Sequence, residues 1–167
     1  MKRSTIIPPA AAVALLIALG APAVARADGD SLKARLRGFE EVPAVSSTGN
    51  GRFRAKIARD ETSISYELSY DDLEGTVTVA HIHLGQRRVA GGVAAFLCGG
   101  GGKPACPQSG EVTGTVTAAD IIGPVGQGLA SGEMAELLRA IRAGVTYVNV
   151  HSDKAPSGEI RGQIKED

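Results

Sequence analysis

The chain contains three histidines, and two of them, His81 and His83, are separated by a single isoleucine. Side chains at positions i and i+2 of a β-strand point to the same face, with their Cα atoms about 6.5–7 Å apart. Two imidazole rings at that spacing can bind one metal ion. The third histidine, His151, ends another apolar stretch, so a fold that brings the two strand ends together would give a site with three imidazole ligands.

Imidazole nitrogen is a borderline ligand that suits copper and zinc better than calcium or magnesium. Three histidines without a fourth, and without an acidic ligand at short spacing, would leave a coordination position open, as a redox or substrate-binding copper ion requires. We therefore favour copper over zinc as the ion. The alternative is that each histidine packs or forms hydrogen bonds at its strand end and has only a structural role.

Other constellations of reactive residues are weaker. The sequence has no Ser-centred nucleophile elbow and no phosphate-binding loop that ends in Gly-Lys-Ser/Thr. The adjacent carboxylates Glu40 and Glu41 are more typical of a solvated turn or a structural role than of a general base. Glu159 and Arg161 share one strand face at i and i+2, and we expect a structural ion pair between them. No catalytic residue is predicted, and enzymatic activity is left open without being favoured.

Polar and apolar residues alternate strictly in three stretches, 32–37, 52–57 and 63–70. This period of two is typical of strands with one buried face. Five further strands are expected, at about 75–83, 92–97, 111–117, 145–151 and 158–164. Because the strands are short and glycine-rich turns separate them, the sequence predicts an all-β fold, a Greek-key-like antiparallel β-sandwich of about eight strands.

One segment departs from the alternation. Four apolar residues follow the i, i+3, i+4, i+7 spacing of a helix: Met134, Leu137, Leu138 and Ile141. Ser131 precedes them as a candidate N-cap, and Gly144 follows as a C-terminal stop. The pattern predicts one amphipathic helix, at about residues 132–143, inserted between two strands. A shorter helical turn is expected at residues 118–122.

Charge and composition exclude several classes of protein. Eighteen basic and eighteen acidic residues give a net charge of zero, which argues against a nucleic-acid partner that is held by phosphate neutralisation. The 43% hydrophobic and 22% charged residues are typical of a globular protein. Two cysteines exclude both a disulfide-dense scaffold and a four-cysteine metal site.

The first 27 residues have the layout of a secretory signal peptide. Lys2 and Arg3 precede an apolar run at residues 10–19, and two small-x-small sites end at Ala25 and Ala27. A run of ten residues is too short to cross a hydrocarbon core about 30 Å thick. We expect cleavage after Ala27, a single mature domain at residues 28–167, secretion or export to the periplasm, and no membrane span after cleavage.

An oxidising compartment bears on Cys98 and Cys106, which flank a segment of seven residues with four consecutive glycines. The segment can fold back on itself, so we expect a local disulfide between the two cysteines. The alternative is a pair of thiolate ligands. Their spacing fits no zinc pattern, and a glycine-rich linker holds no ligand geometry in advance.

Three stretches, taken in order, resemble one known family. They are LRGFEEVPAV at 36–45, AHIHLG at 80–85, and GVTYVNVHS at 144–152 followed by PSGEIRGQI at 156–164. Together they are similar to the CHRD domain, a module named after chordin and common in exported bacterial proteins. The resemblance covers about residues 32–165. It implies a β-sandwich, and it implies that His81, His83 and His151 belong to the family pattern. Ala44 and Ser152 stand where proline and threonine are more usual in that pattern.

A looser resemblance links the chain to copper-zinc superoxide dismutase, an eight-stranded sandwich whose copper is bound by an HxH pair and a later strand-end histidine. This chain lacks the fourth copper-site histidine and the loop that supplies the other zinc ligands. The leading hypothesis is thus an exported protein that binds copper through three histidines. The alternatives are an extracellular protein–protein interaction module with structural histidines and, more weakly, a copper oxidoreductase of the dismutase type.

Overall fold

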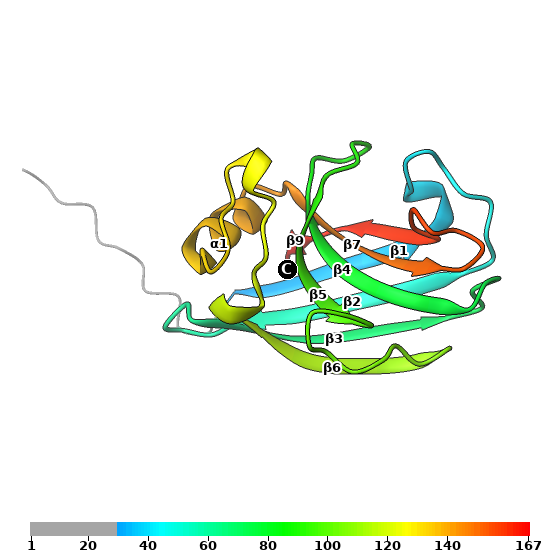
Figure 1. The fold of residues 1–167 in the computed structure, drawn as a ribbon, viewed down its shortest axis with the longest axis horizontal. Coiled ribbons are helices and arrows are strands. Elements are labelled where there is room, and N and C mark those ends of the chain that lie inside the picture. Colours follow the sequence, from blue (N-terminus) through cyan, green and yellow to red (C-terminus); the bar gives the residue numbers. More distant parts are fainter. Residues whose placement is uncertain (1–29) are drawn as a thin grey trace, which may run out of the picture.

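The alternating stretches form strands in the computed structural model, which describes residues 30–167 (Figure 1). The predicted signal peptide lies outside these residues. The strands are β1 (Ser31–Arg37), β2 (Asn50–Ile57), β3 (Ser63–Asp71), β4 (Val77–Leu84), β5 (Gly92–Cys98), β6 (Gly110–Thr117), β7 (Thr146–Ser152), β8 (Ile160–Gln163) and β9 (Lys165–Glu166). The helical elements are α1 (Met134–Arg142) and three short 3-10 helices, η1 (Gly38–Glu40), η2 (Ala118–Asp120) and η3 (Val125–Gln127). The predicted all-β class with a single inserted α-helix is confirmed.

All strand pairs are antiparallel, and the strands join in one sheet with the order β5-β4-β7-β8-β1-β2-β3-β6. The two-residue strand β9 pairs with β1 beside this path, which brings the number of strands to nine. The sheet curls so that β4 and β5 lie across from β2 and β3 (Figure 1). The expected sandwich is therefore a single sheet that folds over on itself.

The two edges of the curled sheet meet at β5 and β6. Ala95 of β5 forms a bridge with Ile121, which follows η2 after the end of β6. The Tyr66 hydroxyl of β3 donates a hydrogen bond of 2.7 Å to the carbonyl of Leu97 on β5. Because these contacts join the two edges, the fold is nearly a barrel. Its apolar core includes Phe53 and Leu68, which have no exposed surface.

Helix α1 packs its apolar face on the core, with all four residues of the predicted stripe buried. Its N-cap is Glu133, so the expectation that Ser131 would cap it is wrong. The Ser131 hydroxyl donates instead to the carbonyl of Ile121, while the Glu133 carboxylate accepts from the Ala130 amide. The helix ends at Arg142, and Gly144 follows it as the expected stop, with a positive φ of 69° that suits a residue without a Cβ. Within residues 30–167, no helix is both long and apolar enough to cross a membrane.

Candidate metal centre

The pairing of β4 with β7 brings the three histidines together, as their positions at strand ends had suggested. In this register His81 lies opposite Asn149, and His151 lies opposite Val79, two residues before His81. Diagonal neighbours of this kind are within reach of large side chains. The ring centroids are 4.9 Å apart for His81 and His151 and 5.2 Å apart for His81 and His83. One candidate ligand atom from each of the three rings lies within 4.8 Å of the other two.

Strand β7 is buried along its whole length because both of its faces are covered. Val148 and Val150 point into the apolar core, and the alternate residues Tyr147, Asn149 and His151 point to the other face. The histidines therefore belong to a polar cluster on the far side of the sheet from the core. All three are buried, with 6–8% of their surface exposed.

Hydrogen bonds that two of the rings donate to backbone carbonyls define the orientation of these rings. The Nδ1 atom of His83 lies 2.9 Å from the carbonyl oxygen of Gly91, and Nδ1 of His151 lies 3.0 Å from that of Pro156. A carbonyl oxygen only accepts, so each Nδ1 carries the proton and each Nε2 presents a lone pair to the cluster. This is the arrangement in which a histidine ligand donates its other N–H to a group outside the site.

The third ring, His81, completes the cluster. Its Nδ1 atom lies 3.1 Å from Nε2 of His151, while Nε2 of His83 is buried and has no hydrogen-bonding partner. The ring of His83 stacks on Tyr147 with the centroids 4.7 Å apart, and the edge of Phe96 packs against His81 at 4.5 Å. The two aromatic neighbours limit the movement of the rings.

Burial keeps all three imidazoles neutral near pH 7. It lowers the pKa of His81 to about 3, and the neighbouring His151 and His83 act in the same direction. It lowers the pKa of His83 to about 4, although the Gly91 carbonyl opposes the shift. It also lowers the pKa of His151. Neutral imidazole is the form that binds a metal ion, so no proton has to leave first.

Two further polar side chains adjoin the histidines. The Oδ1 atom of Asn149 lies 3.0 Å from Nε2 of His151. A Cβ atom added to Gly158 would lie 2.6 Å from Nδ2 of Asn149 and 2.5 Å from Oε1 of Glu41. The two side chains thus meet beside this glycine, which leaves room for both. Burial raises the pKa of Glu41 to about 7, although Arg161 and Asn149 oppose the shift.

Glu41 and Glu40 thus differ, although they are adjacent in the sequence. Glu41 is 8% exposed, and its Oε1 atom has no hydrogen-bonding partner. Glu40 is the solvated residue of the two and forms an ion pair of 2.7 Å with Arg87. Of the two interpretations from sequence, the solvated turn fits Glu40, and Glu41 is a buried carboxyl next to the histidine cluster.

Glu159 and Arg161 contact other groups than each other. The Glu159 carboxylate accepts from the hydroxyls of Ser47 and Ser152 and from two backbone amides. The Arg161 guanidinium donates to the carbonyls of Gln86 and Val89 and lies 3.4 Å above the centre of the Tyr147 ring. Arg161 thereby holds the loop after β4 over the polar cluster. The expected ion pair is not among these contacts, because each charge is already satisfied by backbone and hydroxyl groups.

The Sγ atoms of Cys98 and Cys106 lie 1.98 Å apart, at disulfide distance. Cys98 ends β5 opposite Ala80, which directly precedes His81. The link therefore closes the loop after β5 close to the strand that carries two of the histidines.

A comparison with protein families finds the CHRD domain over residues 32–164 of this chain. The chain belongs to the CHRD family. The match covers β1 through β8 and all three histidines. Separate searches of curated proteins and of solved structures found no match to the chain. The family resemblance inferred from the sequence is therefore confirmed.

The sequence missed three neighbours of the histidines in this CHRD domain. Tyr147 and Asn149 precede His151 at intervals of two, and this alternation already places all three on one strand face. Glu41 gave no comparable signal, since it reaches the cluster from the loop after η1 through tertiary packing. As a whole, the site collects imidazole lone pairs, an amide oxygen and a carboxyl group, which can together hold a cation.

Proposed function

We propose that this CHRD domain binds one transition-metal ion, copper in preference to zinc, through His81, His83 and His151. The observation that carries the proposal is the buried lone pair on Nε2 of His83, which has no hydrogen-bonding partner in the structure. A buried acceptor without a donor costs free energy. A metal ion would satisfy it together with the lone pair of His151.

The geometry is close to that of a bound site. Metal–nitrogen bonds of about 2.0–2.1 Å place two ligand atoms at most about 4.2 Å apart. The candidate nitrogens lie within 4.8 Å of one another, so the rings need to approach by about 1 Å or less to reach distances of about 3.4–4.2 Å between ligand atoms. The hydrogen bond between His81 and His151 would be exchanged for two metal–nitrogen bonds.

The surroundings supply a counter-charge. Glu41 is buried near Asn149, and a carboxyl group with a pKa of about 7 can ionise when a cation binds nearby. Three neutral imidazoles favour copper or zinc over calcium or magnesium. Three protein ligands leave a coordination position open, which suits copper that exchanges electrons or a small ligand. We infer no specific reaction.

We further propose that the protein works outside the cytoplasm, as a secreted or periplasmic domain that is released by cleavage of residues 1–27. The cysteine pair at disulfide distance supports this, because such bonds persist in oxidising compartments.

The metal proposal is tested with purified, chelator-washed protein. The wild type is expected to retain about one Cu(II) per chain after gel filtration, with nitrogen coupling visible by electron paramagnetic resonance. The double variant His81→Ala/His83→Ala is expected to retain none. The His151→Ala variant is expected to bind copper more weakly, because it loses one ligand. It should still bind, because the His81/His83 pair on β4 remains.

Tyr147→Phe is the matched control. It keeps the ring that stacks on His83 and removes only the hydroxyl that contacts Gly91, so copper stoichiometry is expected to stay unchanged. Circular dichroism establishes that each variant is folded. Full copper binding by the double variant would refute the site.

A second candidate function has its own observation. His81 and His151 are already hydrogen-bonded to each other, as structural histidines would be, and Phe39 of η1 is 74% exposed. These features fit an extracellular module that binds another protein through the loops around the cluster. Absence of copper binding by the wild type would favour this function. A dismutase assay of copper-loaded protein tests the third candidate, an oxidoreductase.

A further inference from the structure

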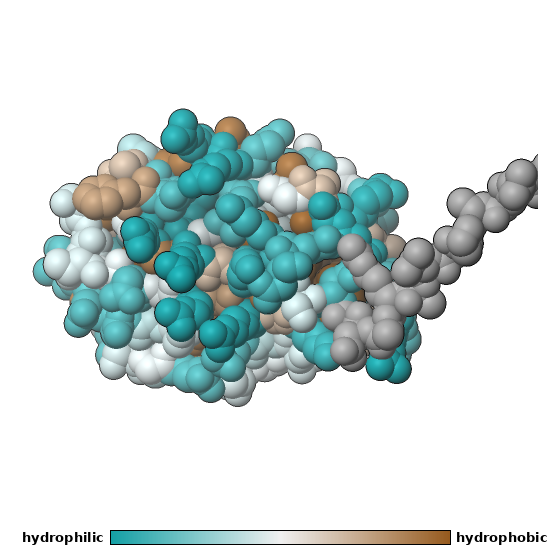
Figure 2. All heavy atoms as spheres, turned by 180° about the vertical axis from the view of Figure 1, so that it is seen from behind, coloured by the Kyte–Doolittle hydropathy of each residue, from teal (hydrophilic) through white to brown (hydrophobic). Residues whose placement is uncertain are grey.

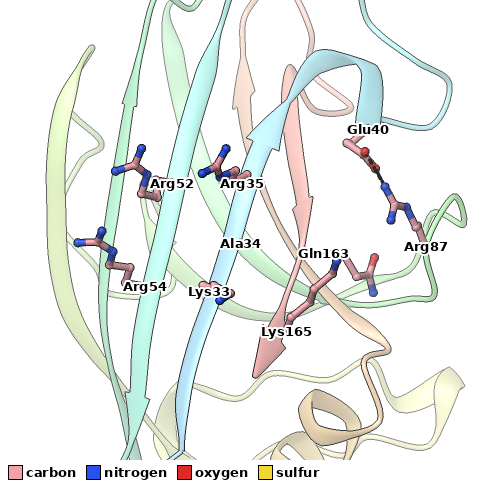
Figure 3. Close-up of a pocket in the computed structure, with 9 residues that line it drawn as sticks. All are labelled: Lys33, Ala34, Arg35, Glu40, Arg52, Arg54, Arg87, Gln163 and Lys165. Carbon is pink, nitrogen blue, oxygen red and sulfur yellow. Dashed lines mark hydrogen bonds and ion pairs between the residues drawn. The ribbon is translucent and has the colours of Figure 1, made fainter. Parts of the chain in front are cut away.

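The outward face of β1, β2 and β9 carries a concentration of positive charge within a protein of zero net charge. A cavity of about 450 Å³ opens on this face. Figure 3 shows its basic side chains, which come from the three strands and from the loop after β4. We name this cavity the basic groove, and its six cations are Lys33, Arg35, Arg52, Arg54, Arg87 and Lys165.

The register of the strands places like charges opposite one another. Lys33 of β1 lies opposite Arg54 of β2, and Arg35 lies opposite Arg52. On its other side, Lys33 lies opposite Lys165 of β9. Directly opposed like charges destabilise a sheet, so the free protein loses stability by holding these cations together. A bound anion would offset that loss.

The acidic residues beside the groove compensate only part of its charge. Glu40 is bonded to Arg87, Asp167 pairs with Lys33, and Glu67 lies opposite Arg54. Arg35 and Arg52 face each other without an acid between them in the register. The groove therefore keeps a surplus of positive charge at its centre.

We propose that the basic groove binds a linear acidic polysaccharide whose sugar units carry carboxylate or sulfate groups. Alternate residues on one strand are about 6.5–7 Å apart and neighbouring strands about 4.8 Å apart, so the cations form a grid along which a chain with repeated oxyanions can lie. Four of the six cations are arginines, whose planar forks bind an oxyanion through two hydrogen bonds at once.

The lining of the groove disfavours other polyanions. It contains no aromatic side chain among the residues that the structure describes, whereas single-stranded nucleic acid is held largely by stacking of its bases on aromatic rings. Ala34 is the only apolar residue in its described lining, so the lining itself offers no large apolar group that could insert into a membrane. Hydrophilic residues cover much of the face seen in Figure 2, with hydrophobic residues in small separate spots.

The wall of the groove is held in place by backbone contacts. Gln163 donates its amide hydrogens to the carbonyls of Gly85 and Gly144, which tie the loop after β4 and the end of α1 to β8. The groove lining includes none of the three histidines. Its function can therefore be tested separately from metal binding.

The test measures binding to two immobilised polysaccharides, one carboxylated (polygalacturonate) and one sulfated (dextran sulfate), by surface plasmon resonance across a salt series. The Arg52→Gln/Arg54→Gln variant is compared with Arg139→Gln/Lys154→Gln, which removes the same charge from other exposed positions. We expect the groove variant to bind at least one polysaccharide about tenfold more weakly than the wild type, and the control variant to change less than about twofold.

Thermal unfolding gives a second measurement. At low salt the groove variant should unfold at a higher temperature than the wild type, because opposed like charges are removed, and the free polysaccharide should raise the unfolding temperature of the wild type more than that of the variant. If the groove and control variants lost binding equally, binding would depend only on the net charge of the protein. That result would overturn the proposal. Tighter binding to a single-stranded oligonucleotide or to anionic phosphatidylglycerol vesicles, or no binding to either polysaccharide, would also overturn it.

Discussion

Glu41 illustrates how the surroundings of a single residue set its chemistry. Its neighbour Glu40 is a partly exposed carboxylate paired with Arg87, whereas the Glu41 carboxyl is buried and remains protonated up to a pH of about 7. In the unfolded chain it ionises near its ordinary pKa of 4.5. The folded state therefore binds the proton more tightly, and the stability that this contributes is lost as the pH rises from 4.5 through 7.

Replacing Glu41 by Gln removes this dependence. We expect Glu41→Gln to be more stable than the wild type at pH 8, by about 1 to 3 kcal/mol, with the difference vanishing near pH 4.5. Urea unfolding at the two pH values measures it, with Glu40→Gln as the control. The same variant should bind copper more weakly at pH 8, because the buried counter-charge is gone. Unchanged stability and unchanged copper binding would mean that Glu41 is not coupled to the site.

The buried histidines have the opposite effect on acid stability. In the unfolded chain they take up protons below their ordinary pKa of 6.5, whereas in the fold His81 and His83 stay neutral down to pH values of about 3 and 4. Metal-free protein should therefore lose stability as the pH falls from 6.5 to 4. The loss approaches about 1.4 kcal/mol per pH unit for each histidine that stays neutral.

Over part of this pH range, protonation of Glu41 in the folded state adds stability. This gain is smaller than the stability lost through the two histidines. Chemical unfolding at half-unit pH steps measures the slope. A His81→Gln/His83→Gln variant should show a shallower slope, and an equally steep one would assign the acid sensitivity to other groups.

At the scale of single elements, alternation in the sequence predicted the strands closely. The alternating stretch 32–37 corresponds to β1 and 63–70 to β3, each within one residue at either end. Alternation is reliable here because one face of each strand meets the core and the other meets water. Strand β7 is different, because its second face is covered by polar partners rather than by water.

What the sequence could not predict depends on contacts between distant segments. Ser131 has the right chemistry for an N-cap, but its hydroxyl donates a hydrogen bond to the carbonyl of Ile121. The helix begins at Met134, with Glu133 as its N-cap. Glu159 and Arg161 have the right spacing for an ion pair, but each meets closer groups from other loops. The proximity of His81 and His83 was predictable because an HxH motif needs only one strand, whereas the position of Glu41 required the complete fold.

The loop between β5 and β6 provides a prediction at the same scale. A disulfide between Cys98 and Cys106 closes a loop of few residues, so its removal is expected to cost about 2 to 3 kcal/mol. The variant Cys98→Ala/Cys106→Ala should unfold at a lower temperature and still bind copper, since neither sulfur contributes to the histidine cluster. Intact mass before and after reduction and alkylation tests the bond itself. Alkylation of two thiols without reductant would contradict it.

At the scale of the whole molecule, the family match over residues 32–164 and the leader inferred at residues 1–27 do not overlap. Export should therefore leave the domain intact. We predict that protein recovered from the periplasm or the medium begins at or near Asp28. N-terminal sequencing of that material measures the cleavage site. Retention of the apolar run at residues 10–19 would place the protein at a membrane instead.

The bridge between Ala95 and Ile121 also bears on how copies of this protein behave toward one another. An open sheet presents unpaired N–H and C=O groups that invite a strand from a second copy, and aggregation begins at such edges. Here one edge, β5, is occupied by the segment after β6, so a concentrated solution should stay dispersed. The protection depends on a loop of a few residues. Heating that releases this loop should expose the edges at β5 and β6 together. Aggregation should then begin at these two edges.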